Sequence, residues 1–365
     1  MSLYALLIVL LPGIALAIQP CPCSTPDLCK PVAKQYKKEL VAFGGAPGWK
    51  NWNWTDITNV VALCDLSNAD CQEMYCFAHS KDVRVTRLVG VAVDDFVKLS
   101  NITFRQQITK SWINLVQNYS LDGINIDIEG AAFTIDVKES ITKLTNESNI
   151  ALKAINPLCL VTFDIPYSPY LVGCLDGYCY DYVSLAKCTD YMIVMDYDAT
   201  IDILIASANS PIPLLKESYD LYIKNLSIDP NLLVMAVPWY GYDYSCKWFF
   251  NRTGDNLCVI AGMPNTQRNF KDIMVLFEKN IGGMKWDSKA ASPFFTIKEG
   301  DVYHQLRFDN QESLTVKYEL AKNLGLRGLG MWTADSLNYT STDPGIVQQT
   351  KSMWDLITSY VEKFI

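Results

Sequence analysis

The sequence predicts an α/β fold, and within that class a closed (β/α)8 barrel. The chain has 365 residues and is half apolar, which suffices for one large core. Short, β-branched apolar segments recur along it, and helical patterns lie between many of them. Strands that are apolar at nearly every position are typical of a parallel sheet that is buried on both faces.

The expected elements follow one another in a strand-then-helix rhythm. Strands are expected at Glu39–Phe43, Ile57–Leu63, Arg84–Val91, Leu121–Glu129, Leu158–Ile165, Tyr191–Tyr197, Leu232–Pro238 and Gly328–Trp332. Helices are expected at Phe104–Gln117, Val137–Ile155, Leu214–Lys224, Ser313–Leu324 and Ile346–Val361. An open, doubly wound sheet is the alternative, but no glycine-rich phosphate loop follows the first strand.

The stretch 240–310 is too long for a single connection. It places Trp286, Tyr303 and Phe308 in short β-like pieces. We therefore expect a TIM barrel with a small insertion after the seventh strand, on the face of the barrel that carries active sites.

The N-terminus predicts a signal peptide of residues 1–17, which leaves residues 18–365 as a single domain. An apolar run from Leu3 to Leu16 ends in the small-residue sequence Ala15-Leu16-Ala17. The alternative is a membrane anchor, but Pro12 and Gly13 interrupt the run, and it is shorter than the roughly 20 residues that a span needs. The absence of Lys or Arg before the run leaves the cleavage point open.

Cysteines and sequons agree with export. The 12 cysteines are even in number and predict disulfides, although spacing alone does not determine their pairing. A zinc site is disfavoured, because His79 and His304 are the only histidines and no Cys-x2-Cys pair repeats. Glycosylation sequons begin at Asn53, Asn101, Asn118, Asn146, Asn225, Asn251 and Asn338. The formal net charge of -8 disfavours nucleic acid as a partner. We expect a monomer without a metal or other cofactor.

The segment Leu121–Glu129 is the strongest indication of chemistry. Side chains of a strand alternate between its faces, so the isoleucines at 124, 126 and 128 would face the helices. Asn125, Asp127 and Glu129 would then point into the barrel and climb to its C-terminal mouth. Burial of such a row costs several kcal/mol unless every group is hydrogen-bonded, so folding alone does not explain it. A solvated edge strand is the alternative, and the isoleucine face argues against it.

Four motifs stand out in chain order. They are Asp122-Gly123-x-Asn125-x-Asp127-x-Glu129, Met195-Asp196-Tyr197-Asp198, Pro238-Trp239-Tyr240-Gly241 and Gly330-Met331-Trp332. Together they resemble the motifs of glycoside hydrolase family 18, the chitinase family. Further segments resemble a lysosomal branch of that family, among them Cys21-Pro22-Cys23, Tyr75-Cys76-Phe77-Ala78-His79-Ser80-Lys81, Val237-Pro238-Trp239-Tyr240-Gly241-Tyr242-Asp243-Tyr244 and Phe308-Asp309-Asn310.

The resemblance implies a function. It implies hydrolysis of the β1-4 bond of N,N′-diacetylchitobiose, at the reducing end of free Asn-linked oligosaccharides or chitooligosaccharides, in the lysosome or after secretion. An endo-acting chitinase and a non-catalytic glycan-binding lectin are the alternatives. The lectin is disfavoured because Glu129, the implied catalytic acid, is present.

The resemblance also implies roles for residues. Glu129 would protonate the leaving oxygen, Asp127 would orient the substrate's own 2-acetamido group as the nucleophile, and Tyr197 would donate a hydrogen bond to that group, with retention of configuration. Trp332 would lie under a sugar ring, Met195 would form a wall, and the expected sugar ligands are Asp198, Tyr240 and Asp309.

Asn125 departs from the chitinases, which have Asp at this position. We expect the Asn125 amide to donate a hydrogen bond that holds Asp127 in one rotamer. We also expect Asp127 to stay anionic at a lower pH than it would beside a carboxylate. His79 is expected to be a buried histidine with a hydrogen-bond partner. Asp164, at the end of the fifth strand, fits either a site role or a structural hydrogen bond.

Overall fold

The structure is a computed structural model that describes most of the chain. It describes residues 21–363, except residues 46, 131–133, 171–179, 200–203, 252–255 and 261–265. The expected signal peptide, residues 1–17, lies outside the described residues. None of the helices among the described residues is long and apolar enough to cross a membrane.

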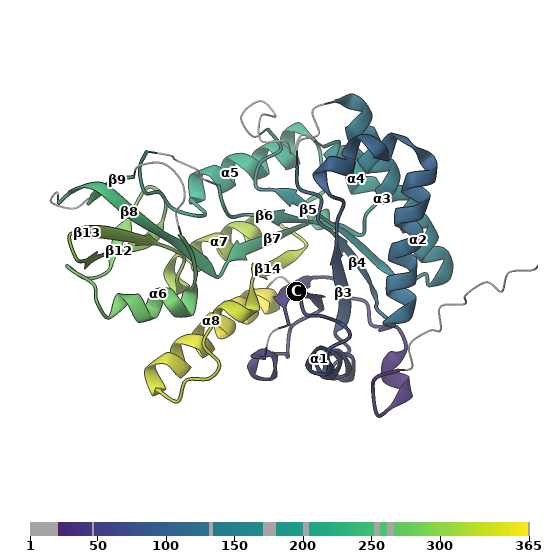
Figure 1. Ribbon diagram of the computed structural model, residues 1–365, viewed down its shortest axis with the longest axis horizontal. Helices are drawn as coiled ribbons and strands as arrows, with labels where there is room; N and C mark the ends of the chain where they lie inside the picture. The colour runs from purple at the N-terminus through teal and green to yellow at the C-terminus, as the bar shows by residue number, and fades with distance from the viewer. Residues whose placement is uncertain are drawn as a thin grey trace, which may run out of the picture.

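Eight parallel strands close into a barrel, in the order β1-β14-β7-β6-β5-β4-β3-β2 (Figure 1). Their bounds are β1 Glu39–Gly44, β2 Asn59–Ala62, β3 Arg84–Val89, β4 Gly123–Ile126, β5 Leu160–Pro166, β6 Tyr191–Met195, β7 Leu233–Pro238 and β14 Gly328–Trp332. Each of the eight predicted segments contains one of these strands or most of it. The predicted barrel is therefore confirmed.

Helices cover the outside of the barrel. Their bounds are α1 Ala69–Ser80, α2 Ile102–Asn118, α3 Ile135–Ile155, α4 Tyr182–Lys187, α5 Ile212–Asp220, α7 Gln311–Asn323 and α8 Pro344–Lys363. A further helix, α6 Phe270–Phe277, packs against the sheet inserted after β7. A π-helical turn, Leu221–Asn225, continues α5, and 3-10 turns lie at Pro26–Cys29, Trp49–Asn51, Val93–Ser100, Pro230–Leu232 and Ala334–Ser336. The five predicted helices correspond to α2, α3, α5, α7 and α8, whereas α1, α4 and α6 were not predicted.

The core has two layers, one on each side of the barrel wall. Ile124, Ile126 and Ile128 belong to the large outer cluster that packs against the helices. Val41, Phe43, Val61, Leu160, Tyr191, Ile193, Val234 and Ala236 form a second cluster. The three isoleucines thus pack on the helix side as predicted. Because faces alternate along a strand, the polar row that starts at Asn125 lies on the barrel's inner side.

The stretch after β7 forms the predicted insertion. It consists of β8 Tyr240–Phe250, β9 Leu257–Ile260, β10 Thr266–Asn269, α6, β11 Lys285–Asp287, β12 Ser292–Glu299 and β13 Val302–Arg307. The strands pair antiparallel in the order β10-β8-β13-β12-β11, and β9 pairs with β8. In Figure 1 this sheet is drawn in green and lies to the left of the barrel, with α6 below it.

Disulfides form among most of the described cysteines, but not all. The pairs are Cys21–Cys29, Cys23–Cys76, Cys64–Cys71 and Cys246–Cys258. Cys159 and Cys188 are free and buried, so the expectation of disulfides throughout is wrong for these two. Both belong to the outer core cluster, where a thiol packs as a small apolar side chain. Cys174 and Cys179 lie outside the described residues.

Candidate active site

The polar row of β4 extends past the last paired residue of the strand. The pairing ends at Ile126, and the Asp127 N–H then donates to the Val89 carbonyl at 2.8 Å. A Cβ atom at Gly90 would lie 2.4 Å from the Asp127 carbonyl oxygen, so only glycine admits this close approach. The backbone of Asp127 therefore continues along β3, and Glu129 follows at an exposed position beyond the end of the strand.

Asp127 and Glu129 form a hydrogen-bonded carboxyl pair. Burial raises the pKa of Asp127 to about 7, and the charge of Glu129 and their shared hydrogen bond contribute. Asp164 on β5 lies beside them; its burial, followed by the charge of Asp127, raises its pKa well above the usual range. Asp127 and Asp164 therefore retain protons at a pH at which an exposed carboxyl group would be ionised.

Asn125 contacts the neighbouring strand, not Asp127. Its Nδ2 group donates to Thr162 Oγ1 at 2.9 Å and to Asp164 Oδ1 at 2.8 Å. The expected hydrogen bond from Asn125 to Asp127 is therefore wrong. The reason is geometric: Asn125 pairs with Thr162 across the sheet, and neighbouring strands are about 4.8 Å apart, whereas Asp127 is two residues along the same strand, roughly 6.6 Å away.

Tyr197, just after the end of β6, lies close to the carboxyl groups of Asp127 and Asp164. It follows β6, and burial raises its pKa well above the usual range, with further contributions from the charges of Asp164 and Asp127. Its ring centroid lies 5.9 Å from that of Tyr240 and 6.2 Å from that of Trp332. Tyr197 thus lies between the carboxyl groups and the two aromatic rings of Tyr240 on β8 and Trp332 on β14.

The Asp198 carboxylate connects β6 to the insertion. Its Oδ1 accepts hydrogen bonds from the hydroxyl groups of Tyr240 at 2.6 Å and Tyr242 at 2.7 Å. Its backbone has a φ of 52°, and its N–H donates to Asn209 Oδ1 at 2.7 Å. Asp198 is exposed. Tyr242 belongs to a segment that resembles the family but was not predicted as a site residue, although it lies two residues from Tyr240 on the same face of β8, a spacing that the strand period could have indicated.

The remaining predicted residues lie in different surroundings. Met195 ends β6 and is half-buried, and Trp332 ends β14, is half-buried and packs against Phe43 with ring centroids 5.3 Å apart. Asp309 is 1% exposed and ion-paired with the buried Lys317 of α7. Asp309 thus pairs with α7 and not with the carboxyl groups of Asp127 and Glu129. The expected role of Asp309 as a sugar ligand does not fit a carboxylate that a lysine already neutralises.

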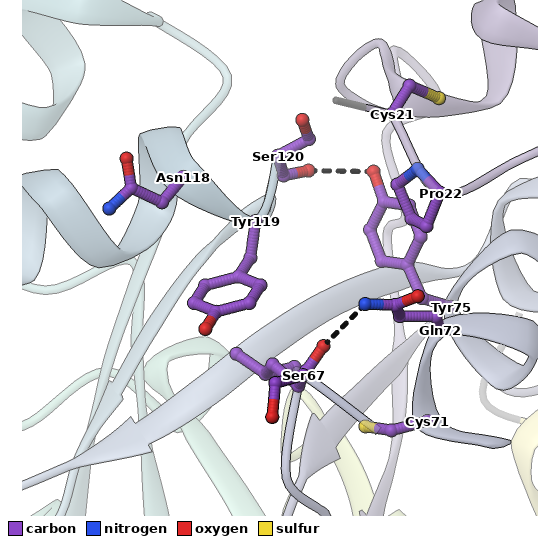
Figure 2. A pocket seen from close by; sticks show the side chains of 10 residues that line it. Cys21, Pro22, Ser67, Cys71, Gln72, Tyr75, Asn118, Tyr119 and Ser120 are labelled. Atoms are coloured by element: carbon purple, nitrogen blue, oxygen red, sulfur yellow. Dashed lines mark hydrogen bonds between the residues drawn. The ribbon is translucent and has the colours of Figure 1, made fainter. Parts of the chain in front are cut away.

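The base of β4 holds structural contacts. His79 Nε2 lies 2.9 Å from Asp122 Oδ2, and both side chains are buried. His79 therefore has a buried hydrogen-bond partner, as expected. A cavity of about 300 Å³ lies nearby, lined by the N-terminal segment, α1 and the end of α2 (Figure 2), and it contains none of the predicted site residues.

Comparison with known sequences places these features in a family. The model of glycosyl hydrolases family 18 matches residues 40–336. Human di-N-acetylchitobiase is 34% identical over 353 residues, which cover 92% of this chain and 88% of the human protein. The probable di-N-acetylchitobiase 1 of Dictyostelium discoideum is 33% identical over 87% of this chain and 88% of its own length.

Solved structures agree on the fold. A chitinase from Trichuris suis superposes with a TM-score of 0.74 at 16% identity, covering 89% of this chain and 100% of that one. A group IV chitinase from Ostrinia furnacalis, in complex with allosamidin, superposes with a TM-score of 0.72 at 18% identity, covering 90% of this chain and 99% of that one. With a barrel of this topology and a family match over most of its length, the chain is a glycoside hydrolase and belongs to glycosyl hydrolases family 18.

Proposed function

We propose that this enzyme hydrolyses the β1-4 bond of N,N′-diacetylchitobiose at the reducing end of free Asn-linked oligosaccharides or chitooligosaccharides. The observation that carries the proposal is the hydrogen-bonded pair of Asp127 and Glu129 at the mouth of the barrel, in a chain similar to several di-N-acetylchitobiases. The substrate that those names state is the reason for choosing this oligosaccharide within the family.

In the first step, Glu129 protonates the glycosidic oxygen as the bond to the anomeric carbon breaks. The carbonyl oxygen of the substrate's own 2-acetamido group forms the new bond to that carbon and gives an oxazolinium ion. The exposed position of Glu129, beyond the end of β4, supports its contact with a leaving sugar. The step requires a 2-acetamido group, so cellobiose should not react.

Asp127 accepts a hydrogen bond from the acetamido N–H and so holds the acetamido oxygen toward the anomeric carbon. Its Oδ1 atom is buried and has no hydrogen-bond donor among the described residues. A buried acceptor without a donor costs free energy, on the order of 1–3 kcal/mol, and a substrate N–H would remove that cost. The open acceptor therefore supports the orienting role.

Tyr197 donates its hydroxyl hydrogen to the acetamido oxygen. Its raised pKa keeps the hydroxyl protonated, so it remains a donor throughout the working pH range. Trp332, whose ring lies near that of Tyr197, offers an aromatic face to the sugar. Asp198, held by two tyrosine hydroxyls, and Met195 complete the surroundings of the substrate.

In the second step, Glu129 has lost its proton and acts as a base. It removes a proton from water as the water oxygen bonds to the anomeric carbon and the bond between that carbon and the acetamido oxygen breaks, which restores the 2-acetamido group. Water enters from the side that the leaving sugar has vacated, so the configuration is retained. The raised pKa values of Asp127 and Asp164 mean that protons stay in this group up to near neutral pH. This supports an enzyme that works in an acidic compartment, and we place it in the lysosome, with secretion as the alternative.

The test uses N,N′,N″-triacetylchitotriose with a free reducing end and the same sugar reduced to its alditol. The wild type should release single N-acetylglucosamine from the free end only. Glu129→Gln should lower the rate about 10²–10⁴-fold, the usual contribution of a general acid. Glu299→Gln, which removes an exposed carboxylate at the end of β12, is the matched control and should keep the rate.

Other results would exclude the proposal. Internal cuts in long chitin, with equal activity on the reduced sugar, would identify an endo-acting chitinase. Binding of the trisaccharide by the wild type without any cleavage would identify a lectin.

A further inference from the structure

Tyr180 contacts the backbone on both sides of Glu129. It lies just before α4, and its side chain is 6% exposed. Its hydroxyl oxygen is 2.6 Å from the Ile128 carbonyl oxygen and 3.3 Å from that of Gly130. One hydroxyl group thus donates toward the two carbonyl oxygens that flank the residue to which the acid chemistry is assigned.

These contacts occur where the support of the sheet ends. The pairing of β4 with its neighbours stops at Ile126, and one further bond, from the Asp127 N–H to Val89, follows. Glu129 is two residues beyond that bond, and Gly130 has a φ of 154°, which lets the chain turn away. A donor that bridges residues 128 and 130 fixes the direction in which the side chain of residue 129 leaves the backbone.

The Tyr180 hydroxyl is itself held in place. Its ring centroid lies 5.9 Å from that of Phe163 on β5 and 6.1 Å from that of Tyr182 on α4. Burial raises the pKa of Tyr180, and the charges of Glu129 and Asp127 raise it further. The hydroxyl group therefore stays protonated, and remains a donor, at any pH at which the enzyme works.

We infer that Tyr180 is a positioning residue for the acid: it holds the backbone at 128–130 so that the Glu129 carboxyl group reaches the glycosidic oxygen and keeps its hydrogen bond to Asp127. The inference rests on the proposed role of Glu129. It assigns no contact between Tyr180 and the substrate. Because displacement of a reacting group by about 1 Å can lower a rate about 100-fold, loss of one hydroxyl should be visible in kcat.

The chain contains a matched control at the other end of the same strand. Tyr75 on α1 is 3% exposed, and its hydroxyl donates to the Ser120 carbonyl at 2.8 Å (Figure 2). Ser120 precedes β4, whereas residues 128 and 130 follow it. Tyr75→Phe and Tyr180→Phe therefore each remove a buried hydroxyl that donates to a main-chain carbonyl beside β4, at opposite ends of the strand.

The experiment compares both variants with the wild type on a chitooligosaccharide that the wild type cleaves. Tyr180→Phe should lower kcat 10- to 100-fold with KM within about twofold, and should shift the pH–rate profile because the pairing of Glu129 with Asp127 changes. Both variants should lower the melting temperature by similar amounts, but Tyr75→Phe should leave kcat and the pH–rate profile unchanged. An unchanged kcat in Tyr180→Phe, or equal losses in both variants, would overturn the inference.

Hydrogen exchange gives a readout that does not depend on catalysis. Amides in a peptide spanning residues 124–130 should exchange faster in Tyr180→Phe than in the wild type and in Tyr75→Phe. Equal exchange in all three proteins would overturn the positioning role even if the enzyme cleaves no chitooligosaccharide. If the proposed function is wrong, in contrast, the wild type would cleave other sugars or no sugar at all.

Discussion

Two aspartates flank β4, and the two ends of the strand hold them in opposite ways. Asp122, before the first residue, is 2% exposed and accepts hydrogen bonds from the N–H groups of Val32 at 2.8 Å and Val85 at 2.7 Å, beside His79. Asp127, after the last residue, has a buried oxygen without a donor among the described residues and a pKa raised to about 7.

The difference separates a structural carboxylate from one that is available for chemistry. A buried carboxylate whose oxygens accept several hydrogen bonds stabilises the fold, because its charge is compensated. A carboxylate that shares its surroundings with two others is left partly unsatisfied, which costs folding free energy and keeps a proton within reach of a ligand. Four substitutions would break or sharpen this comparison.

The largest effect is expected at the base of the strand. Asp122→Ala leaves two buried N–H groups and His79 without their acceptor, and should lower the free energy of unfolding by about 3–5 kcal/mol. Urea unfolding at pH 7 measures it. Asp122→Asn, which keeps one acceptor oxygen, should lose less. The folded fraction of either variant should keep the wild-type kcat, and a selective loss of kcat would contradict the structural assignment.

Asp127→Asn should have the opposite sign on stability. In the unfolded chain this carboxyl group ionises near the ordinary aspartate pKa of 3.8, whereas in the native state it holds its proton to about pH 7. The native state therefore loses stability as the pH rises from about 4 to 7, and the loss persists above that window. Since asparagine does not ionise, the variant should be more stable than the wild type at pH 8, by on the order of 2–4 kcal/mol, and nearly equal at pH 4.

Urea unfolding across pH 4–8 checks this prediction. Asp301→Asn removes an exposed carboxylate in the turn before β13 and should leave the pH dependence of the wild type intact. Hydrolysis by Asp127→Asn should be strongly reduced at every pH. A variant that is equally destabilised at both ends of the pH range would show that the charge of Asp127 is compensated in the native state.

Gly90→Ala tests the backbone beneath Asp127. The new Cβ atom would lie 2.4 Å from the Asp127 carbonyl oxygen, so the backbone must shift, at a cost of about 1–3 kcal/mol. A shift of the chain that carries Asp127 and Glu129 should lower kcat by about tenfold or more. Thermal melting and steady-state kinetics measure both effects. Gly345→Ala in the first turn of α8, where the nearest atom belongs to a side chain at 3.1 Å, should change neither.

Asn125→Asp should have the smallest effect. It places a fourth carboxyl group between Thr162 and Asp164, and like-charge repulsion should raise the pKa of Asp127 further. We expect the acidic limb of the pH–rate profile to move upward by about one unit. Asn125→Ser, which adds no charge, is the control. Identical acidic limbs in the wild type and Asn125→Asp would mean that the amide does not tune the carboxyl pair.

The barrel strands could be predicted from the sequence because each is a short, nearly continuous apolar run, which is the pattern of a parallel strand buried on both faces. The side of β4 that carries Asn125 and Asp127 followed from the two-residue period and the three isoleucines. Helix α1 was missed because its polar and cysteine-rich residues carry no clear apolar stripe, although Asn68 caps its first turn.

Hydrogen-bond and ion-pair partners that are far apart in the sequence could not be predicted, since they depend on strand register and on the paths of loops. The hydrogen bonds of Asn125 to Thr162 and Asp164 depend on the register of β4 against β5, which the composition of neither strand determines. The pairing of Asp309 with Lys317 joins the end of the insertion to α7, and the contact of Tyr180 with residues 128 and 130 joins the segment before α4 to the segment after β4.

The double hydrogen bond at Asp198 gives the inserted sheet a direct connection to the barrel mouth. One carboxylate oxygen accepts the hydroxyls of both Tyr240 and Tyr242, the first and third residues of β8. A sequence change in the sheet that tilts β8 would move this oxygen, and with it the segment next to Tyr197, while the eight-stranded scaffold stayed as it is. We therefore expect substitutions in the inserted sheet to change the position of the Asp198 carboxylate more than the pairing of the barrel strands.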